Sequence, residues 1–175
     1  MTVAVVEGQP DIRFGLSLRP PFEMSRAQVE IHDIVARQYG SMCAGRFMPH
    51  ATIKGFFRSD ASVDAMVATL EPAMARHEPI DVFNRGVIPF GRGGGPVLDI
   101  HHLEDGRPNA SLQRFHEEVF TALAPLIRQD CDFTPVEGAM EDFHAHLTLA
   151  MGDIPRGLTA ELLDFLDDAG PVGPA

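Results

Sequence analysis

The sequence predicts an α+β fold of two similar halves, in which mostly antiparallel sheets surround a central cleft. Two observations favour this fold. A His-x-Thr tripeptide occurs once in each half of the chain, at residues 50–52 and 146–148. In each half the tripeptide lies on an extended segment that follows a strand pattern and a helix pattern. The repeated order predicts a duplicated β-α-β unit with pseudo-two-fold symmetry and a bilobal shape.

The first half opens with a strand pattern at residues 12–18, where apolar side chains recur at every second position. A helix follows over residues 25–39, with Ser25 as the predicted N-cap and Gly40 as the predicted end. The first His-x-Thr strand covers residues 50–57. A second helix pattern covers residues 60–77, and we expect Pro72 to bend or split that helix.

The second half begins with a predicted hairpin, formed by extended segments at residues 80–90 and 96–102 and joined by the glycine run at 91–95. The run lacks the Gly-Lys-Ser/Thr ending of a phosphate-binding loop. Asn109 is the predicted N-cap of a third helix, and Pro125 disturbs its last turn. The second His-x-Thr strand covers residues 143–151, and a fourth helix covers 158–166. We expect one domain over residues 1–175, with lobes at about 11–90 and about 91–170.

Each predicted His-x-Thr strand carries its polar side chains on one face. Because side chains alternate between the two faces of a strand, His50 and Thr52 point the same way. His146 and Thr148 do the same in the second copy. The opposite face of the second strand is apolar throughout and consists of Phe143, Ala145, Leu147, Leu149 and Met151. We therefore expect both strands to turn their polar faces toward one shared cleft.

Charge and composition exclude several classes of function. The 175 residues carry a formal net charge of −11, so the sequence provides no broad basic surface for an extended nucleic acid. No run of eighteen apolar residues occurs, and residues 1–6 lack the positive flank of a signal peptide. We therefore expect a cytoplasmic monomer that binds no membrane and engages any nucleic acid only at an end or at a single nucleotide.

The two motif segments, HATIKGFF at residues 50–57 and HAHLTLA at 144–150, resemble the paired His-x-Thr/Ser motifs of the 2H phosphoesterase superfamily. The resemblance is greatest to the bacterial 2′-5′ RNA ligase and cyclic phosphodiesterase-like proteins. It implies a bilobal fold with both motifs in the cleft. It also implies that His50 and His146 are catalytic, that Thr52 and Thr148 bind phosphate, and that neither a cofactor nor a metal is needed.

The residue types fit the opening of a cyclic phosphodiester. One histidine can take a proton from the attacking water while the other gives a proton to the departing sugar oxygen. Reversible 2′-5′ ligation is the related reaction, and the resemblance does not assign the base and the acid. Candidate substrates are 2′,3′-cyclic nucleotides, RNA ends, 2′-5′ linked oligonucleotides and the cyclic phosphate of ADP-ribose. Residues 137–142 are neutral or acidic where the ligase branch often has basic residues, which argues against tight binding of long RNA.

Two other functions stay open at this stage. His144 and His146 alternate as in some zinc sites, and His50, His101 or Asp142 would complete the ligand set of a zinc-dependent hydrolase. A non-catalytic module that binds nucleotides or phosphate would keep the cleft without turnover.

Two neighbouring side chains have uncertain roles in the sequence. Lys54 lies on the face of His50, and we expect it to be solvated at the end of its strand. His144 lies on the face of His146 and either lines the cleft or shields it.

Overall fold

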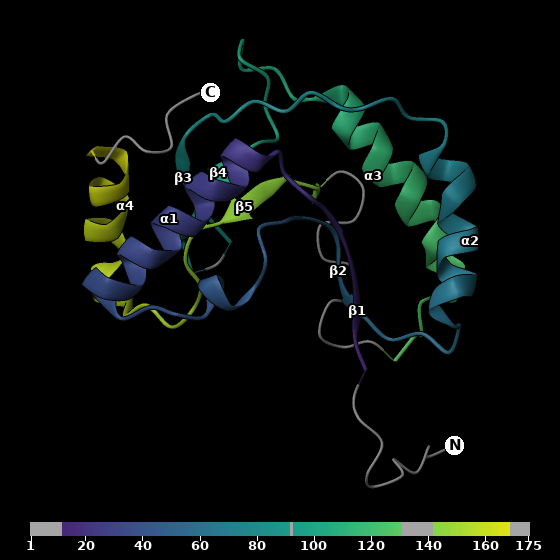
Figure 1. Ribbon diagram of the computed structural model, residues 1–175, viewed down its shortest axis with the longest axis horizontal. Helices are drawn as coiled ribbons and strands as arrows, with labels where there is room; N and C mark the ends of the chain where they lie inside the picture. The colour runs from purple at the N-terminus through teal and green to yellow at the C-terminus, as the bar shows by residue number, and fades with distance from the viewer. Residues whose placement is uncertain (1–11, 92, 131–141, 169–175) are drawn as a thin grey trace, which may run out of the picture.

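The computed structural model describes residues 12–91, 93–130 and 142–168 and shows a five-stranded sheet with helices around it (Figure 1). The strands are β1 (Phe14–Leu18), β2 (Ala51–Phe57), β3 (Val87–Phe90), β4 (Gly95–Asp99) and β5 (His146–Thr148). Their order in the sheet is β1-β2-β5-β4-β3, and every neighbouring pair is antiparallel. The predicted α+β fold with an antiparallel sheet is confirmed.

Four α-helices lie at the two ends of the sheet: α1 (Phe22–Tyr39), α2 (Val63–Met74), α3 (Ala110–Leu123) and α4 (Thr159–Asp168). Helices α2 and α3 pack together at one end, and α1 and α4 lie together at the other (Figure 1). Short 3-10 helices η1 (Ala44–Arg46), η2 (Ala124–Leu126) and η4 (Arg156–Leu158) join the main elements. Within the described residues, no helix is both long enough and apolar enough to span a membrane.

The start of α1 differs from the prediction. The helix begins at Phe22 with Pro21 as the N-cap residue, so Ser25 is not the N-cap and lies within the first turn. The fixed φ of proline, here −55°, prepares the chain for a helix. The Ser25 hydroxyl instead donates a hydrogen bond to the carbonyl of Pro20. Gly40 ends the helix as predicted, with a left-handed φ of 69° that favours glycine.

Side-chain caps decide where α2 and α3 begin, and both helices end near a proline. Ser62 accepts a hydrogen bond from the backbone N–H of Ala65, which makes α2 shorter than the predicted range of 60–77. Pro72 does not split α2, which ends two residues later at Met74. Asn109 accepts from the Leu112 N–H and caps α3 as predicted. The α-helix stops at Leu123, and the turn that contains Pro125 is a 3-10 helix.

The predicted hairpin is confirmed, but both of its strands are shorter than expected. The glycine run forms its turn, with Gly91 and Gly94 at φ values of 68° and 62°. Residues 80–86 are not a strand, because Gly86 has a φ of 99° and its N–H bonds to the Asn84 side chain. Strand β4 ends at Asp99, whose carboxylate accepts a hydrogen bond from the His101 backbone N–H.

Strands β2 and β5, which carry the two His-x-Thr tripeptides, are neighbours in the centre of the sheet, where Ala51 pairs with Leu147. The regular part of the second motif strand is limited to three residues. Its predicted apolar face is buried from Phe143 to Leu149, whereas Met151 is 42% exposed and does not belong to the core.

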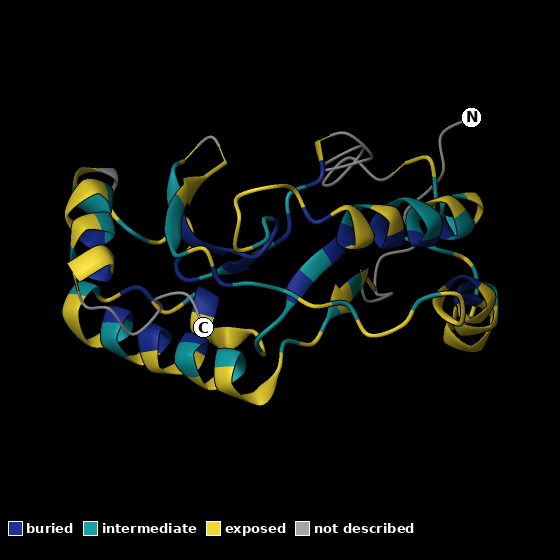
Figure 2. Cartoon of the chain, turned by 90° about the horizontal axis from the view of Figure 1, so that it is seen from above, coloured by how far each residue is buried: buried dark blue, intermediate teal, exposed yellow. Residues whose placement is uncertain are grey.

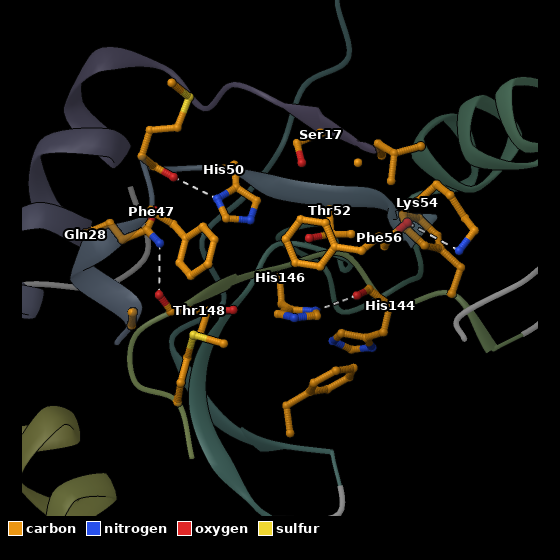
Figure 3. Close-up of a pocket in the computed structure, with 18 of the residues that line it drawn as sticks. Ser17, Gln28, Phe47, His50, Thr52, Lys54, Phe56, His144, His146 and Thr148 are labelled. Atoms are coloured by element: carbon orange, nitrogen blue, oxygen red, sulfur yellow. Dashed lines mark hydrogen bonds between the residues drawn. The ribbon is translucent and has the colours of Figure 1, made fainter. Parts of the chain in front are cut away.

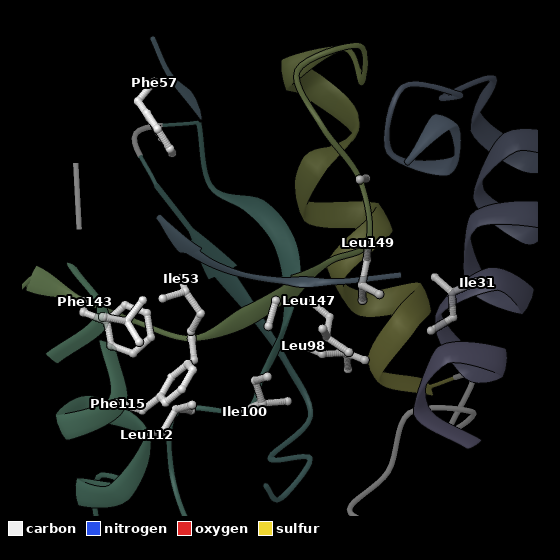
Figure 4. Close-up of a cluster of buried hydrophobic side chains, with 14 of the residues drawn as sticks. Ile31, Ile53, Phe57, Leu98, Ile100, Leu112, Phe115, Phe143, Leu147 and Leu149 are labelled. Atoms are coloured by element: carbon white, nitrogen blue, oxygen red, sulfur yellow. The ribbon is translucent and has the colours of Figure 1, made fainter. Parts of the chain in front are cut away.

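The hydrophobic core lies on the sheet face opposite to the polar side chains of the motifs. The helices carry buried residues on one side and exposed residues on the other (Figure 2). The apolar side chains of the motif strands pack there against those of α1, α3 and β4 (Figure 4). The labelled members of this core are Ile31, Ile53, Phe57, Leu98, Ile100, Leu112, Phe115, Phe143, Leu147 and Leu149. Each motif strand is therefore held from behind by core packing while its other face stays open.

Candidate active site

A pocket of about 340 Å³ lies on the open face of β2 and β5 (Figure 3). His50 and Thr52 line it from the first motif, and His146 and Thr148 line it from the second. The structure therefore brings all four predicted site residues into one cavity. Their roles in binding and catalysis stay predictions.

Both motif histidines are fixed in the same way. The Nδ1 atom of His50 lies 2.7 Å from the carbonyl oxygen of Met48, and the Nδ1 atom of His146 lies 2.8 Å from the carbonyl oxygen of His144. A carbonyl oxygen only accepts, so Nδ1 carries the proton in both rings. Each neutral ring therefore has its lone pair on Nε2, the nitrogen that can take a proton from a substrate or a water molecule.

The environment of His146 favours its neutral form. Burial lowers the pKa of His146 below the ordinary value of histidine, and protonation of the neighbouring His144 or His50 would lower this pKa further. The hydrogen bond to the His144 carbonyl opposes the shift. The ring of Phe90 covers the imidazole of His146, with 4.1 Å between the ring centroids. An unprotonated His146 is suited to accept a proton near neutral pH.

Helix α1 holds the second motif through two polar side chains that the sequence reasoning missed. Gln28 donates from Nε2 to the Thr148 carbonyl at 2.9 Å, and His32 Nε2 contacts the same oxygen at 2.8 Å. The two residues are four apart on one helix face, and Gln28 also lines the pocket. A polar pair within the buried stripe of a predicted helix is the signal that would have identified them.

Lys54 is not solvated as expected. Its residue is 3% exposed and lines the pocket, and its ammonium group donates to the Gly55 carbonyl at 3.3 Å. A buried cation beside the two motif strands can attract an anionic substrate. His144 also lines the pocket, which answers the question of whether it faces the cleft.

Exposed apolar side chains surround the pocket. Phe47, Phe56 and Phe90 all line it and all have exposed surface, as do Met48 and Met151. The rings of Phe47 and Phe56 lie 6.5 Å apart between centroids. Aromatic faces of this kind provide stacking surfaces for a nucleobase.

Comparison with known proteins gives one match. The family model for the 2′-5′ RNA ligase superfamily matches residues 21–172. The chain belongs to this superfamily, which is the 2H phosphoesterase superfamily. No curated protein and no solved structure matches the chain. Members of the 2H phosphoesterase superfamily generally have phosphoesterase or ligase activity.

The described residues of this 2H phosphoesterase superfamily member do not support the zinc ligands considered from the sequence. The candidate cluster consists of Asp99, His102 and His144, whose ligand atoms all lie within 4.8 Å of one another. Of the ligands proposed from the sequence, His144 is a member of that cluster, whereas His50, His101, Asp142 and His146 are not. His101, one of the ligands considered from the sequence, is buried and stacks on His144 with a centroid distance of 4.9 Å. Of the neutral or acidic residues 137–142 before the second motif, residues 137–141 lie outside the described residues, and Asp142 is exposed and lines the pocket.

Proposed function

We propose that this protein is a metal-independent phosphoesterase that hydrolyses a cyclic phosphodiester of a small nucleotide or an RNA end, with reversible 2′-5′ RNA ligation, in which a 5′-hydroxyl takes the place of the attacking water, as a related activity. The observation that carries the proposal is the equivalent placement of two imidazoles. His50 directly precedes β2 and His146 begins the adjacent strand β5, and both residues line one pocket and carry their protons on Nδ1. Two histidines that share one pocket supply both the base and the acid of the reaction.

In the proposed reaction, His146 is the base. Its Nε2 takes a proton from water as the water oxygen forms a bond to phosphorus. His50 acts as an imidazolium and gives its Nε2 proton to the sugar oxygen as the phosphorus–oxygen bond breaks. The lowered pKa of His146, caused first by burial, supports this assignment, because a base must be unprotonated before the reaction.

Two groups can stabilise the charge on the phosphate. The hydroxyls of Thr52 and Thr148 are suited to donate hydrogen bonds to the non-bridging oxygens, which become more negative in the transition state. The ammonium group of Lys54 adds a positive charge to the same wall. These contacts need no metal ion.

The size and lining of the pocket support a small substrate. Its volume of about 340 Å³ is near the lower end of ligand pockets, which range over roughly 300–1,000 Å³. One nucleotide suits that volume better than an oligonucleotide does. Phe47, Phe56 and Phe90 can stack on its base while the phosphate lies between the histidines.

Turnover of a panel of cyclic phosphates in EDTA tests the proposal. The panel contains the four 2′,3′-cyclic nucleotides, a 2′-5′ linked dinucleotide and the cyclic phosphate of ADP-ribose. We expect turnover of at least one compound, and His50→Ala and His146→Ala should each lower kcat by about a hundred- to ten-thousandfold. The double variant should lose less than the product of the two single losses, because the pair acts as a unit.

His77→Ala is the matched control, because His77 lies between α2 and α3 and pairs with Glu118 away from the pocket. This variant should keep the wild-type kcat. If His50→Ala folds normally and retains full turnover of every compound that the wild type accepts, the two-histidine mechanism is wrong. A non-catalytic nucleotide-binding module then takes its place.

A further inference from the structure

A second cluster of side chains lies beside the pocket at the end of β4. Asp99 is the last residue of that strand, His102 follows three residues later, and His144 precedes β5. His102 Nδ1 lies 2.7 Å from Asp99 Oδ2, and His144 Nε2 lies 3.2 Å from Asp99 Oδ1. Two imidazoles from separate segments of the chain therefore meet on one carboxylate.

The cluster is fixed by the fold and is not a set of mobile surface groups. Asp99 is 6% exposed, and the side chains of His102 and His144 are 30% and 23% exposed. The backbone N–H of His101 donates to Asp99 Oδ1 at 2.8 Å, and the ring of His101 stacks on His144. Contacts of this kind hold the side chains of a metal site in place before the ion binds.

His144 Nε2 is buried but has no hydrogen-bond partner among the described residues. Asp99 Oδ1 lies 3.2 Å from this nitrogen, so the two groups attract each other electrostatically through a contact that is not well aligned for a hydrogen bond. Buried polar nitrogens in folded proteins nearly always have a hydrogen-bond partner, so this nitrogen without a well-aligned one is a candidate to bind a ligand. A metal ion between the two groups would satisfy both atoms.

We propose that Asp99, His102 and His144 bind a divalent transition-metal ion, with zinc as the best fit. Two imidazole nitrogens and one carboxylate oxygen, with a fourth position open to water, form a ligand set typical of zinc. Zinc–ligand bonds of about 2.0–2.2 Å place tetrahedral ligand atoms about 3.3 Å apart. Binding would widen the distances of 2.7 and 3.2 Å toward this value, and the two imidazole nitrogens lie within 4.8 Å of each other.

The protonation states of the cluster suit an ion. Burial and the charge of His102 lower the pKa of His144 despite the opposing effect of Asp99, which favours the neutral ring that a metal requires. Burial alone would raise the pKa of Asp99, but hydrogen bonds from His102 and from the His101 N–H lower it and keep the carboxylate ionised. On binding, His102 coordinates through Nδ1 and carries its proton on Nε2.

The ion would have a structural effect on the pocket and would take no part in the acid–base reaction. The His144 carbonyl holds Nδ1 of His146, so an ion that fixes His144 stabilises the segment that orients His146. The inference does not depend on the proposed function, because it concerns binding by three residues outside the His50 and His146 pair.

Zinc titration of the full chain tests the site. Protein stripped with EDTA and dialysed is titrated with Zn²⁺ in competition with a chromophoric chelator. We expect one ion per chain and a rise in Tm on binding. His102→Ala should weaken zinc binding by at least about tenfold. Loss of a hydrogen bond that supports a metal ligand already lowers metal affinity by about that factor, and loss of the ligand itself should lower it at least as much. Asp99→Asn should weaken it similarly and keeps an oxygen for the His101 N–H.

Matched variants distinguish the outcomes. His77→Ala removes a histidine from elsewhere and should bind zinc like the wild type, as should His50→Ala. Wild-type protein that binds no zinc, or folded His102→Ala that binds it equally well, would overturn the site. Loss of binding in His50→Ala with full binding in His102→Ala would also overturn it and would favour the ligand set of His50, His144 and His146. None of these readouts measures turnover, so the proposed function can fail while the metal site stands.

Discussion

At the scale of single residues, the two His-x-Thr tripeptides share more than their composition. In each, the histidine bonds through Nδ1 to the carbonyl two residues earlier in the chain. The alternation of side chains on a strand predicted which residues would face the cleft. It did not predict the backbone contact that selects the tautomer, because that contact depends on the conformation of residues just before each strand.

Lys54 shows why burial could not be predicted from the motif alone. A lysine near the end of a strand is ordinarily solvated, since its charged group is costly to bury. Here the aromatic side chains of Phe47 and Phe56 line the same pocket, and Lys54 is 3% exposed. Phe56 lies on β2 itself, whereas Phe47 comes from the connection between η1 and β2, whose path has no periodic signal in the sequence.

Replacing the motif threonines tests their predicted contacts with phosphate. Thr52→Val and Thr148→Val remove a hydroxyl and keep the branched shape, so each should lower kcat by about ten- to a hundredfold, the scale of one hydrogen bond to a charged group. Steady-state kinetics on the best cyclic phosphate measures this loss, which should be smaller than that in His50→Ala. Thr52→Ser and Thr148→Ser keep the hydroxyl and serve as controls. An unchanged kcat in both valine variants would contradict the assigned role.

At the scale of elements, each half of the chain holds the motif strand of the other half. Helix α1 contacts the Thr148 carbonyl of β5 through His32, and helix α3 contacts the Ile53 carbonyl of β2 through His116 Nδ1 at 2.8 Å. The apolar stripes of both helices were visible in the sequence. The sequence did not show which strand each helix contacts, because an apolar stripe identifies the buried face of a helix but does not specify what covers that face.

The element boundaries were predictable where a local capping interaction decides them. Gly40 and Asn109 end and begin their helices as expected. Ser25 has the right chemistry for a cap, but Pro21 starts the helix earlier. The strand expected from residue 80 is interrupted by Gly86, whose backbone conformation the apolar pattern around it does not reveal.

Asp153 links the loop after β5 to the connection that leads from α1 toward His50. Its carboxylate accepts hydrogen bonds from the Ser41 hydroxyl and from the backbone N–H groups of Met42 and Cys43, at 2.7–2.9 Å. Asp153→Ala should lower the free energy of unfolding by about 1–2 kcal/mol, because three donors lose one charged acceptor. Urea unfolding at pH 7 measures the change.

Asp164→Ala is a suitable control, since it removes an exposed aspartate from α4 and leaves the Asp153 contacts intact. Burial opposes ionisation of Asp153, but the same three donors lower its pKa to about 2. The contribution of Asp153 should therefore persist at pH 4. Equal stability of Asp153→Ala and wild-type protein at pH 7 would show that the carboxylate is not a link between the two loops.

At the scale of the whole molecule, the buried and partly buried histidines make stability depend on pH. Burial is the main cause that lowers the pKa values of His32, His101, His144 and His146 in the folded state. In the unfolded chain a histidine titrates near about 6.5. The folded state therefore binds fewer protons, and the free energy of unfolding falls as the pH decreases from about 6.5 through the lowered folded values.

Urea unfolding at pH 8, 7, 6 and 5 should show similar midpoints at pH 8 and 7 and a progressive decrease below. Asp99 and Asp153, whose folded pKa values are also lowered, add a further loss when the pH falls below their unfolded value of about 3.9. A midpoint at pH 5 that equals or exceeds the midpoint at pH 8 would contradict the assignment of neutral buried histidines.

The distribution of charge predicts which substrates the molecule prefers. The chain carries 25 acidic and 14 basic residues, and Lys54 is the single lysine or arginine among the described residues that line the pocket. Binding that tracks an RNA backbone needs several such contacts and weakens steeply with salt, with a slope of roughly 0.7 per contacted phosphate for a single strand. One or two contacts should therefore give a shallow salt dependence.

We expect a short RNA with a 2′,3′-cyclic phosphate end to compete with a cyclic mononucleotide, and a long RNA with a 3′-hydroxyl end to compete poorly at physiological salt. Competition assays over a salt series measure both quantities. The same long RNA prepared with a cyclic phosphate end is the matched control, because it differs only at the terminus that the pocket would bind. It should compete like the short RNA, since added length brings few further contacts to an acidic surface. Nanomolar binding of the long 3′-hydroxyl RNA, independent of its sequence, would show that a basic surface outside the pocket contributes and that the preference for a terminal nucleotide is wrong.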